Sequence, residues 1–300
     1  MRVAALFLMA CACAAQVEFK PKLAKGQSFE VFVTRVMETG QTEMPFDAPS
    51  GRVVVSVEEA GPEGFVLSWK PDVAPLDPTI LGNESVAKAA ADLAGLHFEP
   101  MLSTDGKLLR LRNEAAVLEQ FQKFVKTMLA VNGEQFPDPE MRKKMNEMMA
   151  NTLTPEMLLA LSAMDLDTFF FAGGKTFDAE KTQRATVQVA NPLGGKEKVG
   201  AERAWTLLPG EAGATARTVA WTQRLDPKAM RVLMKQMMPM TDLPEEALEK
   251  LPSMDVEEEG EVTVDLLTGL PISVRHKRTQ KMGTQTLLQL TTSMRVVPGK

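Results

Sequence analysis

The sequence predicts an α+β protein in which a curved, half-barrel-like antiparallel sheet packs against several methionine-rich amphipathic helices. Three observations support this fold class. Short segments with period-two alternation of apolar residues occur near both ends of the chain, which is typical of half-buried strands. Turns rich in glycine and proline join consecutive segments, which favours antiparallel hairpins. Helical segments are grouped between the strand segments without strict alternation, which argues against a doubly wound fold.

The first strand group lies before residue 112. Residues 29–36 (FEVFVTRV) alternate apolar and other side chains, and residues 52–58 and 65–69 form the next two predicted strands. Gly61-Pro62-Glu63-Gly64 joins these two strands as a turn. Asp105-Gly106 is a further hairpin signal, because Asp-Gly favours tight turns between strands.

Helical periodicity begins near Asn113. Leu118, Phe121 and Val125 recur at three- and four-residue spacing, as on the apolar face of an amphipathic helix. Later helix starts are indicated by a capping residue followed by proline in the first turn. These starts are predicted at Asp138-Pro139, Thr154-Pro155 and Asp226-Pro227, with a short fourth helix at Pro244.

The second strand group follows residue 184. Thr268-Gly269-Leu270-Pro271 predicts a hairpin turn within it. The acidic run 255–261 (DVEEEGE) is interpreted as a solvated connector, and the basic residues 275–278 and Lys281 as a solvated strand face. The predicted strands are 185–190, 204–208, 216–223, 261–266, 272–279 and 286–297.

The first fifteen residues predict export. Arg2 is followed by an apolar stretch and by Ala12-Cys13-Ala14, a small-x-small cleavage site. We therefore expect a signal peptide at 1–15 and a single α+β domain at 16–300, located in the periplasm or outside the cell. In an alternative interpretation, Leu8-Met9-Ala10-Cys11 is an imperfect lipobox, and Cys11 carries a lipid anchor.

Several function classes are disfavoured by composition and motifs. The formal net charge of −5 lacks the basic footprint of a nucleic-acid-binding protein, and after residue 15 no apolar run is long enough to cross a bilayer as a helix. No metal-ligand spacing, nucleophile elbow or phosphate-binding loop occurs, so we expect no metal, no cofactor and no catalytic residue. An enzyme would have to use His97 or His276. Asp165 and Asp167 are interpreted as capping or solvated acids.

Three short blocks carry a resemblance to known proteins. The segment KGQSFEVFVTRV (25–36), the turn LSTDGKLLRL (102–111) and the hairpin DLLTGLPISVRHKRT (265–279) resemble uncharacterised secreted envelope proteins of bacteria. Those proteins in turn resemble the LolA-like lipoprotein carriers, in which a half-barrel sheet packs against helices. The resemblance implies a curved antiparallel sheet able to hold an acyl chain or the hydrophobic segment of a partner.

Methionine is the most unusual feature of the composition. Of the 20 methionines, Met1 and Met9 lie in the predicted signal peptide, and most of the others fall in two helical segments. Each segment repeats the spacing i, i+4, i+7, i+8, which places four methionines on one helix face. The two stripes are Met141, Met145, Met148 and Met149, and Met230, Met234, Met237 and Met238.

The stripes have three interpretations. They form core, with methionine filling irregular gaps; or a groove for a lipid or an apolar protein segment; or a Cu(I) site of thioether ligands. The function we favour is an exported, non-catalytic envelope protein that binds a lipid or other hydrophobic ligand between the sheet and the 141–149 or 230–238 helix. The alternatives are a structural or interaction module without a ligand, and a periplasmic Cu(I)-binding protein.

Overall fold

The computed structural model describes most of the chain from residue 16 to residue 298. All structural statements below refer to these residues. The described ranges are 16–39, 42–72, 91–93, 95–135, 138–141, 143, 154–179, 181–191, 198–211, 213–231 and 254–298.

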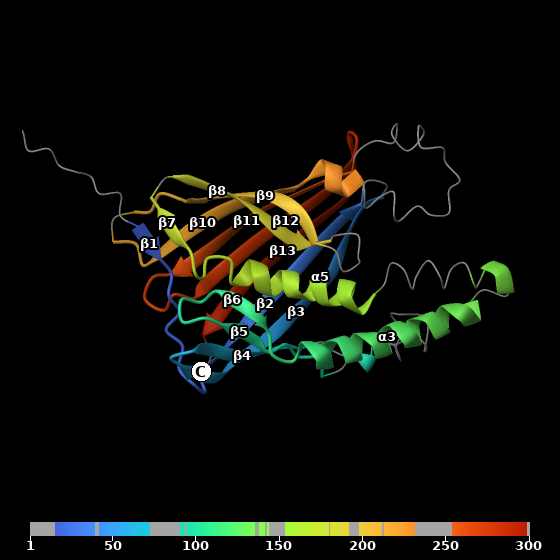
Figure 1. Ribbon diagram of the computed structural model, residues 1–300, viewed down its shortest axis with the longest axis horizontal. Helices are drawn as coiled ribbons and strands as arrows, with labels where there is room; N and C mark the ends of the chain where they lie inside the picture. The colour runs from blue at the N-terminus through green and yellow to red at the C-terminus, as the bar shows by residue number, and fades with distance from the viewer. Residues whose placement is uncertain are drawn as a thin grey trace, which may run out of the picture.

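A large antiparallel sheet of eleven strands dominates the described fold (Figure 1). The strands run in the spatial order β6-β5-β4-β3-β2-β13-β12-β11-β10-β9-β8. Their bounds are β2 Ser28–Thr39, β3 Thr42–Gly61, β4 Gly64–Asp72, β5 Pro100–Leu102, β6 Leu108–Leu111, β8 Thr182–Ala190, β9 Lys198–Leu207, β10 Ala216–Leu225, β11 Met254–Asp265, β12 Pro271–Met282 and β13 Gln285–Pro298. A separate two-stranded sheet pairs β1 (Gln16–Glu18) with β7 (Thr176–Asp178). This architecture confirms the predicted α+β class with a large antiparallel sheet.

The pairing of β2 with β13 unites the two strand groups that the sequence places at opposite ends of the chain. Val31 lies opposite Val296, and Val33 lies opposite Met294. Val31, Val33 and Met294 are buried, because alternate residues of each strand face the helices. The hairpin turns follow the sequence prediction: Gly106 and Gly269 both have positive φ (83° and 69°), which glycine adopts without strain.

The acidic run 255–261 belongs to a strand, and its interpretation as a solvated connector is wrong. It forms the first half of β11 and pairs with β12, where Glu259 lies opposite Lys277 and Glu258 opposite Arg278. The like charges within each segment disfavour a strand, but the opposite charges at facing positions of β11 and β12 stabilise the pair. The prediction for the basic run is half right, since Lys277 faces outward while His276 and Arg278 are buried.

Two long helices lie with the sheet. They are α3 (Glu114–Gln135) and α5 (Pro155–Phe169). The cap predicted for α5 is present, because the Thr154 hydroxyl accepts a hydrogen bond from the backbone N–H of Met157 at 3.1 Å. α5 crosses one face of the sheet, where it contacts β11 and β12, and α3 packs beside it (Figure 1).

Two further predicted helix starts are also present. The Asp138 carboxylate accepts a hydrogen bond from the N–H of Glu140, and Asp226 accepts one from the N–H of Lys228, both at 2.9 Å. These contacts are the expected N-cap bonds that satisfy otherwise unpaired helix N–H groups. The helix predicted at Pro244 lies outside the described residues.

Aromatic side chains fill the core between α5 and the sheet. Phe169, the last residue of α5, is fully buried and meets Trp69 edge-on with ring centroids 5.1 Å apart. The chain then turns at Gly173, where it touches the β5–β6 hairpin so closely that an added Cβ would lie 2.0 Å from the carbonyl oxygen of Gly106. Glycine is therefore required where α5 ends and the chain returns toward β7.

The remaining fold predictions are tested only in part. Met141 is exposed (53%) and Met230 is fully buried, while the other six stripe methionines lie outside the described residues. The predicted signal peptide at 1–15, with Cys11, also lies outside them. In the described part of the chain, no helix combines the length and the apolar character needed to cross a membrane. The single domain at 16–300 stays a prediction.

Candidate functional site

A row of polar side chains crosses the inner face of the sheet, among buried apolar side chains of the core. Arg203 of β9 lies opposite Gln223 of β10, Gln223 lies opposite Glu258 of β11, and Glu258 lies opposite Arg278 of β12. Each of these residues occupies a position where strand alternation points the side chain toward α5. The sheet thus places a cation, an amide, a carboxylate and a second cation side by side beneath the helix.

Hydrogen bonds and ion pairs run along this row. Arg203 Nε donates to Gln223 Oε1 at 2.8 Å, and Gln223 Nε2 donates to Glu258 Oε2 at 3.2 Å. Glu258 also faces Arg278 Nε at 3.8 Å and His276 Nε2 at 3.4 Å. Glu258 is therefore the carboxylate that the side chains of both His276 and Arg278 of β12 approach.

Beside this row, three flat rings form a stack. Trp221 lies between Phe171 and His276, with centroid distances of 5.1 and 5.2 Å and nearly parallel planes. Gly260 lies opposite Trp221 on β11, and a Cβ added there would be 2.5 Å from the indole ring. The absence of a side chain at Gly260 is what leaves room for the stack.

The segment from α5 to β7 supplies charges that face the row. Asp165 forms an ion pair with Arg35 of β2. Asp167 makes no ion pair within 4.0 Å among the described residues, although the charges of Arg203 and Lys175 act on it. Lys175 donates a hydrogen bond to the Phe171 carbonyl oxygen, and its ammonium lies 4.2 Å from the centre of the Phe171 ring.

These charged and aromatic groups line one end of a cavity of about 510 Å³ between α5 and the sheet. Ligand pockets commonly have volumes of roughly 300–1,000 Å³, so this cavity is large enough for a small molecule. Its other wall is apolar and is formed by α5 and β8. The apolar lining residues include Met157, Ala160, Leu161, Met164, Val187 and Val189.

The charge around the cavity is predominantly positive. Its described lining contains five cationic residues, Lys107, Lys175, Lys198, Arg203 and Arg278, and only two carboxylates, Asp167 and Glu258. The cavity therefore has an apolar wall and a cationic end.

Burial shifts the pKa values of the groups at this end. Desolvation, followed by the positive charge of Arg203, lowers the pKa of Lys175 from 10.5 to about 8. Desolvation also lowers the pKa of Arg203. Burial alone would raise the pKa of Glu258, but the close approach of His276 and the charges of Arg278 and Arg203 outweigh it and lower that pKa.

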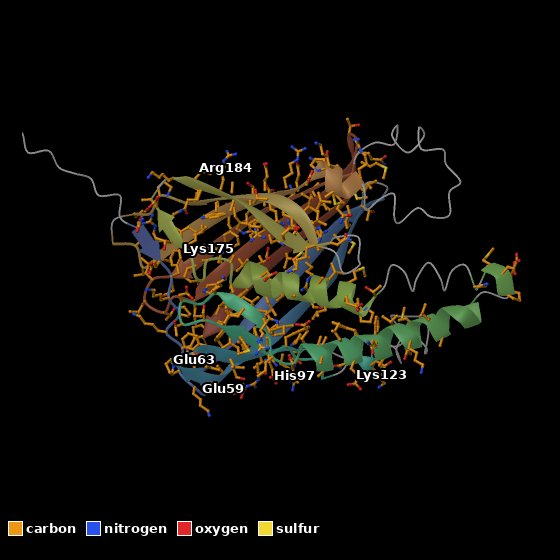
Figure 2. All side chains as sticks on the ribbon, viewed as in Figure 1. Glu59, Glu63, His97, Lys123, Lys175 and Arg184 are labelled. Atoms are coloured by element: carbon orange, nitrogen blue, oxygen red, sulfur yellow. The ribbon has the colours of Figure 1, made fainter. Side chains whose placement is uncertain are left out.

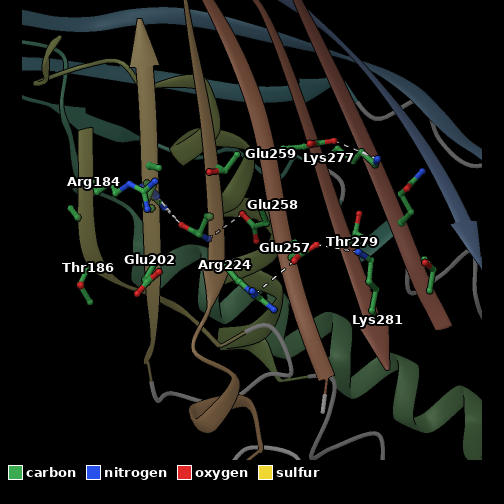
Figure 3. A pocket seen from close by; sticks show the side chains of 17 residues that line it. Arg184, Thr186, Glu202, Arg224, Glu257, Glu258, Glu259, Lys277, Thr279 and Lys281 are labelled. Carbon is green, nitrogen blue, oxygen red and sulfur yellow. Dashed lines mark hydrogen bonds and ion pairs between the residues drawn. The ribbon is translucent and has the colours of Figure 1, made fainter. Parts of the chain in front are cut away.

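The opposite face of the same strands carries a larger, open hollow of about 950 Å³ (Figure 3). Several of its charges are paired across the strands, including Lys277 with Glu259 at 3.4 Å and Lys281 with Glu257 at 3.1 Å. Such exposed pairs contribute little and attract no particular ion. We therefore place the candidate site in the smaller inner cavity, where five cationic residues accompany only two carboxylates and an apolar wall lies beside them.

The two histidines lie in different environments. His97 is half-exposed near the start of α3, apart from Lys175 (Figure 2), with its Nε2 3.3 Å from Glu99 Oε1. His276 is buried against Trp221 beside Glu258. Each histidine thus meets a carboxylate, but neither is among the residues that line the inner cavity. The prediction of a non-catalytic protein stays a prediction.

The interpretation of Asp165 and Asp167 as capping or solvated acids needs correction in part, since Asp167 is solvent-exposed but neither residue caps a helix start. Both lie in the last turns of α5, where a carboxylate cannot cap the N–H groups of the helix start. Asp165 instead pairs with Arg35, and Asp167 lines the cavity. Among the described residues, no group of three or more His, Cys, Asp or Glu is arranged to hold a metal ion.

Sequence reasoning missed the main residues of the candidate site. Arg203, Gln223, Glu258 and Arg278 were not singled out for function, although a signal for them exists in the strand pattern. In β10 and β11, a polar residue replaces an apolar one in phase with buried neighbours, as Gln223 does between Trp221 and Leu225. A polar side chain at a core position of a strand is costly unless it is paired, so it marks a site worth examining.

Comparisons with known proteins give no family for this chain. No protein-family model matches the sequence, and no curated protein matches it. The candidate site therefore rests on its geometry and chemistry alone.

Proposed function

We propose that this protein is an exported, non-catalytic binding protein that holds a lipid or other hydrophobic ligand between the sheet and its helices. The observation that carries the proposal is the cavity between α5 and the sheet, with an apolar wall along the helix. Ligand sites in proteins are commonly cavities that are lined mostly by apolar side chains.

The wall of α5 suits a flexible apolar ligand. Met157 and Met164 are unbranched and polarisable, and they can adjust to chains of different shape. Leu161 is 43% exposed although it lies on the same helix face, so apolar surface is available to a ligand. The proposal thus moves the groove from the 141–149 or 230–238 helix to α5.

The wider setting of the proposal comes from the sequence. The N-terminal segment supports export, and the resemblance to LolA-like carriers supports a sheet that curves as a half-barrel around an acyl chain.

Native mass spectrometry tests the proposal. The full chain is produced with its own N-terminal segment in a bacterial host, purified without detergent and sprayed from a volatile buffer. We expect a co-purifying mass in the lipid range. We also expect the neutral apolar dye N-phenyl-1-naphthylamine to bind the delipidated protein with increased fluorescence.

A cavity-filling variant locates the binding site. Ala160→Phe adds a ring to the cavity wall and should abolish both the bound mass and the dye signal. Ala163→Phe is the matched control, because it adds the same ring to α5 at a position that does not line the cavity. A bare protein mass together with no dye binding would contradict the proposal and favour an interaction module, whereas a bound copper mass would favour the thioether site.

A further inference from the structure

The cationic end of the cavity contains positive charges that have no close counter-ion in the part of the chain that the structure describes. Among the described residues, no carboxylate oxygen lies within 4.0 Å of the Lys175 ammonium or the Arg203 guanidinium. Arg203 donates its hydrogen bonds to a neutral amide, that of Gln223, and Lys175 donates to a backbone carbonyl. Both side chains are thus hydrogen-bonded, but neither charge is neutralised by direct contact.

The fold holds these two cations over one aromatic ring. The Lys175 ammonium is 4.2 Å and the Arg203 guanidinium carbon 5.5 Å from the centre of the Phe171 ring. Bringing like charges together in a partly desolvated place is unfavourable, and this cost is seen at Lys175, whose pKa is lowered by desolvation and by the charge of Arg203. An anion placed between them would relieve it.

A third cation of the cavity also has an unused donor. Arg278 Nε is buried and makes no hydrogen bond, and its distance of 3.8 Å to Glu258 is too long for one. The indole N–H of Trp221, which also lines the cavity, is likewise buried without a partner. Buried donors that lack an acceptor are rare in folded proteins, so these two groups are available to donate to an acceptor in the cavity.

From these contacts we infer that the ligand is an anionic amphiphile, a long-chain carboxylate whose acid group binds at Lys175 and Arg203 while its chain lies along α5. This inference rests on the proposed function and specifies its ligand class. A carboxylate suits Arg203 and Lys175, because charged hydrogen bonds to a guanidinium or ammonium are strong in a desolvated site. The apolar wall of Met157, Leu161 and Val187 begins at the same cavity and would bind the chain.

Two ligands of equal chain length, one charged and one neutral, separate binding of the acid group from binding of the chain, and two small anions serve as controls. Decanoate, 1-decanol, acetate and inorganic phosphate are each titrated against the dye-loaded full chain at pH 7, and decanoate is also titrated by calorimetry. We expect decanoate to displace the dye at a concentration about tenfold or more below that of decanol, since a charged hydrogen bond supplies at least that factor. Acetate and phosphate should displace no dye.

Substitutions at the cationic end complete the test. In Lys175→Met and Arg203→Met the decanoate preference should be lost while decanol binding is unchanged. Lys181→Met and Arg184→Met are the matched controls, because they remove the same charges from exposed positions nearby and should keep the preference. The retained decanol binding also shows that each variant is folded.

The outcomes distinguish the inference from the proposed function. Equal displacement by decanoate and decanol, or a decanoate preference that survives both substitutions, overturns the inference and leaves an apolar-ligand carrier. Absence of dye binding together with no heat from decanoate overturns the proposed function and the inference with it. Tight binding of acetate or phosphate would instead show a small-anion site and contradict the amphiphile.

Discussion

Glu258 is the residue on which the buried charge row depends. It accepts a hydrogen bond from Gln223 and faces both His276 and Arg278, and its side chain is 11% exposed. Burial of a charge is costly, and the cost is offset only when counter-charges and hydrogen bonds surround it. The three partners of Glu258 supply both.

Removal of this carboxylate charge should therefore be strongly destabilising. We expect Glu258→Gln to lower the free energy of unfolding by about 3–5 kcal/mol, the range found when one partner of a buried ion pair is removed. Urea unfolding followed by circular dichroism measures the change. Glu259→Gln is the control one residue along the same strand, where the exposed pair with Lys277 predicts a loss of no more than about 1 kcal/mol. Equal losses in the two variants would contradict a special role for Glu258.

Lys175 gives the stability a defined pH dependence. Its pKa is about 8 in the folded protein and 10.5 when unperturbed, so between these values the unfolded chain binds more protons than the folded one. Stability from this group must rise as pH increases from about 8 toward 10.5. Relative to Lys175→Met, the wild-type protein should gain up to about 2 kcal/mol between pH 7 and pH 9.5. Parallel urea titrations of the two proteins at both pH values check this, and an unchanged difference would show that Lys175 is not desolvated.

At the scale of the element, α5 determines whether the cavity exists. The helix begins at the Thr154 cap, crosses the inner face of the sheet and ends in Phe169 and Phe170, which anchor it in the aromatic core. Between these ends, Met157, Leu161 and Met164 line the cavity. The helix is thus fixed firmly at its C-terminal end, while its middle supplies the accessible wall.

The cap at the other end can be tested separately. Thr154→Ala removes the acceptor for the N–H of Met157 and should reduce the stability by about 1 kcal/mol, the usual contribution of an N-cap. Thr154→Ser keeps an oxygen at the same place and should stay within about 0.5 kcal/mol of the wild type. Thermal and urea unfolding measure both variants. A serine variant as unstable as the alanine variant would show that the methyl group, and not the cap bond, matters.

At the scale of the whole molecule, the β2–β13 pairing makes one sheet from segments more than 240 positions apart in sequence. The main core contains residues from both halves of that sheet, including Trp69 and Trp221. A continuous core predicts cooperative unfolding, even though a chain of 300 residues is long enough for two domains.

The three tryptophans allow a direct test of the predicted single domain. Variants that keep only Trp69 or only Trp221 report on the N-terminal and C-terminal halves of the sheet. In each variant, we expect the urea midpoint measured by tryptophan fluorescence to equal the midpoint measured by circular dichroism. Two separated transitions in either variant would show that the halves unfold as independent domains.

The elements of the fold could be predicted from the sequence better than the candidate site, because the elements depend on local interactions. Local signals were sufficient for the elements: the Thr154-Pro155 start of α5, the Asp105-Gly106 turn and the alternation of residues 29–36 each describe interactions within a few residues. The connector predicted at 255–261 was wrong because its charges are stabilised by β12, a partner that local patterns do not contain. The candidate site depends on the same kind of long-range pairing.

The sequence by itself determined the α+β class, the hairpins and the start of α5, because alternation, turn residues and helix caps act over short distances. Only the tertiary structure decided that Arg203, Gln223, Glu258 and Arg278 stand in one row, since four separate strands must be brought into register to align them. It likewise placed Lys175 and Arg203 over a shared ring at the end of a cavity. The binding properties proposed for Lys175 and Arg203 depend on their desolvation at that place, which no local sequence pattern encodes.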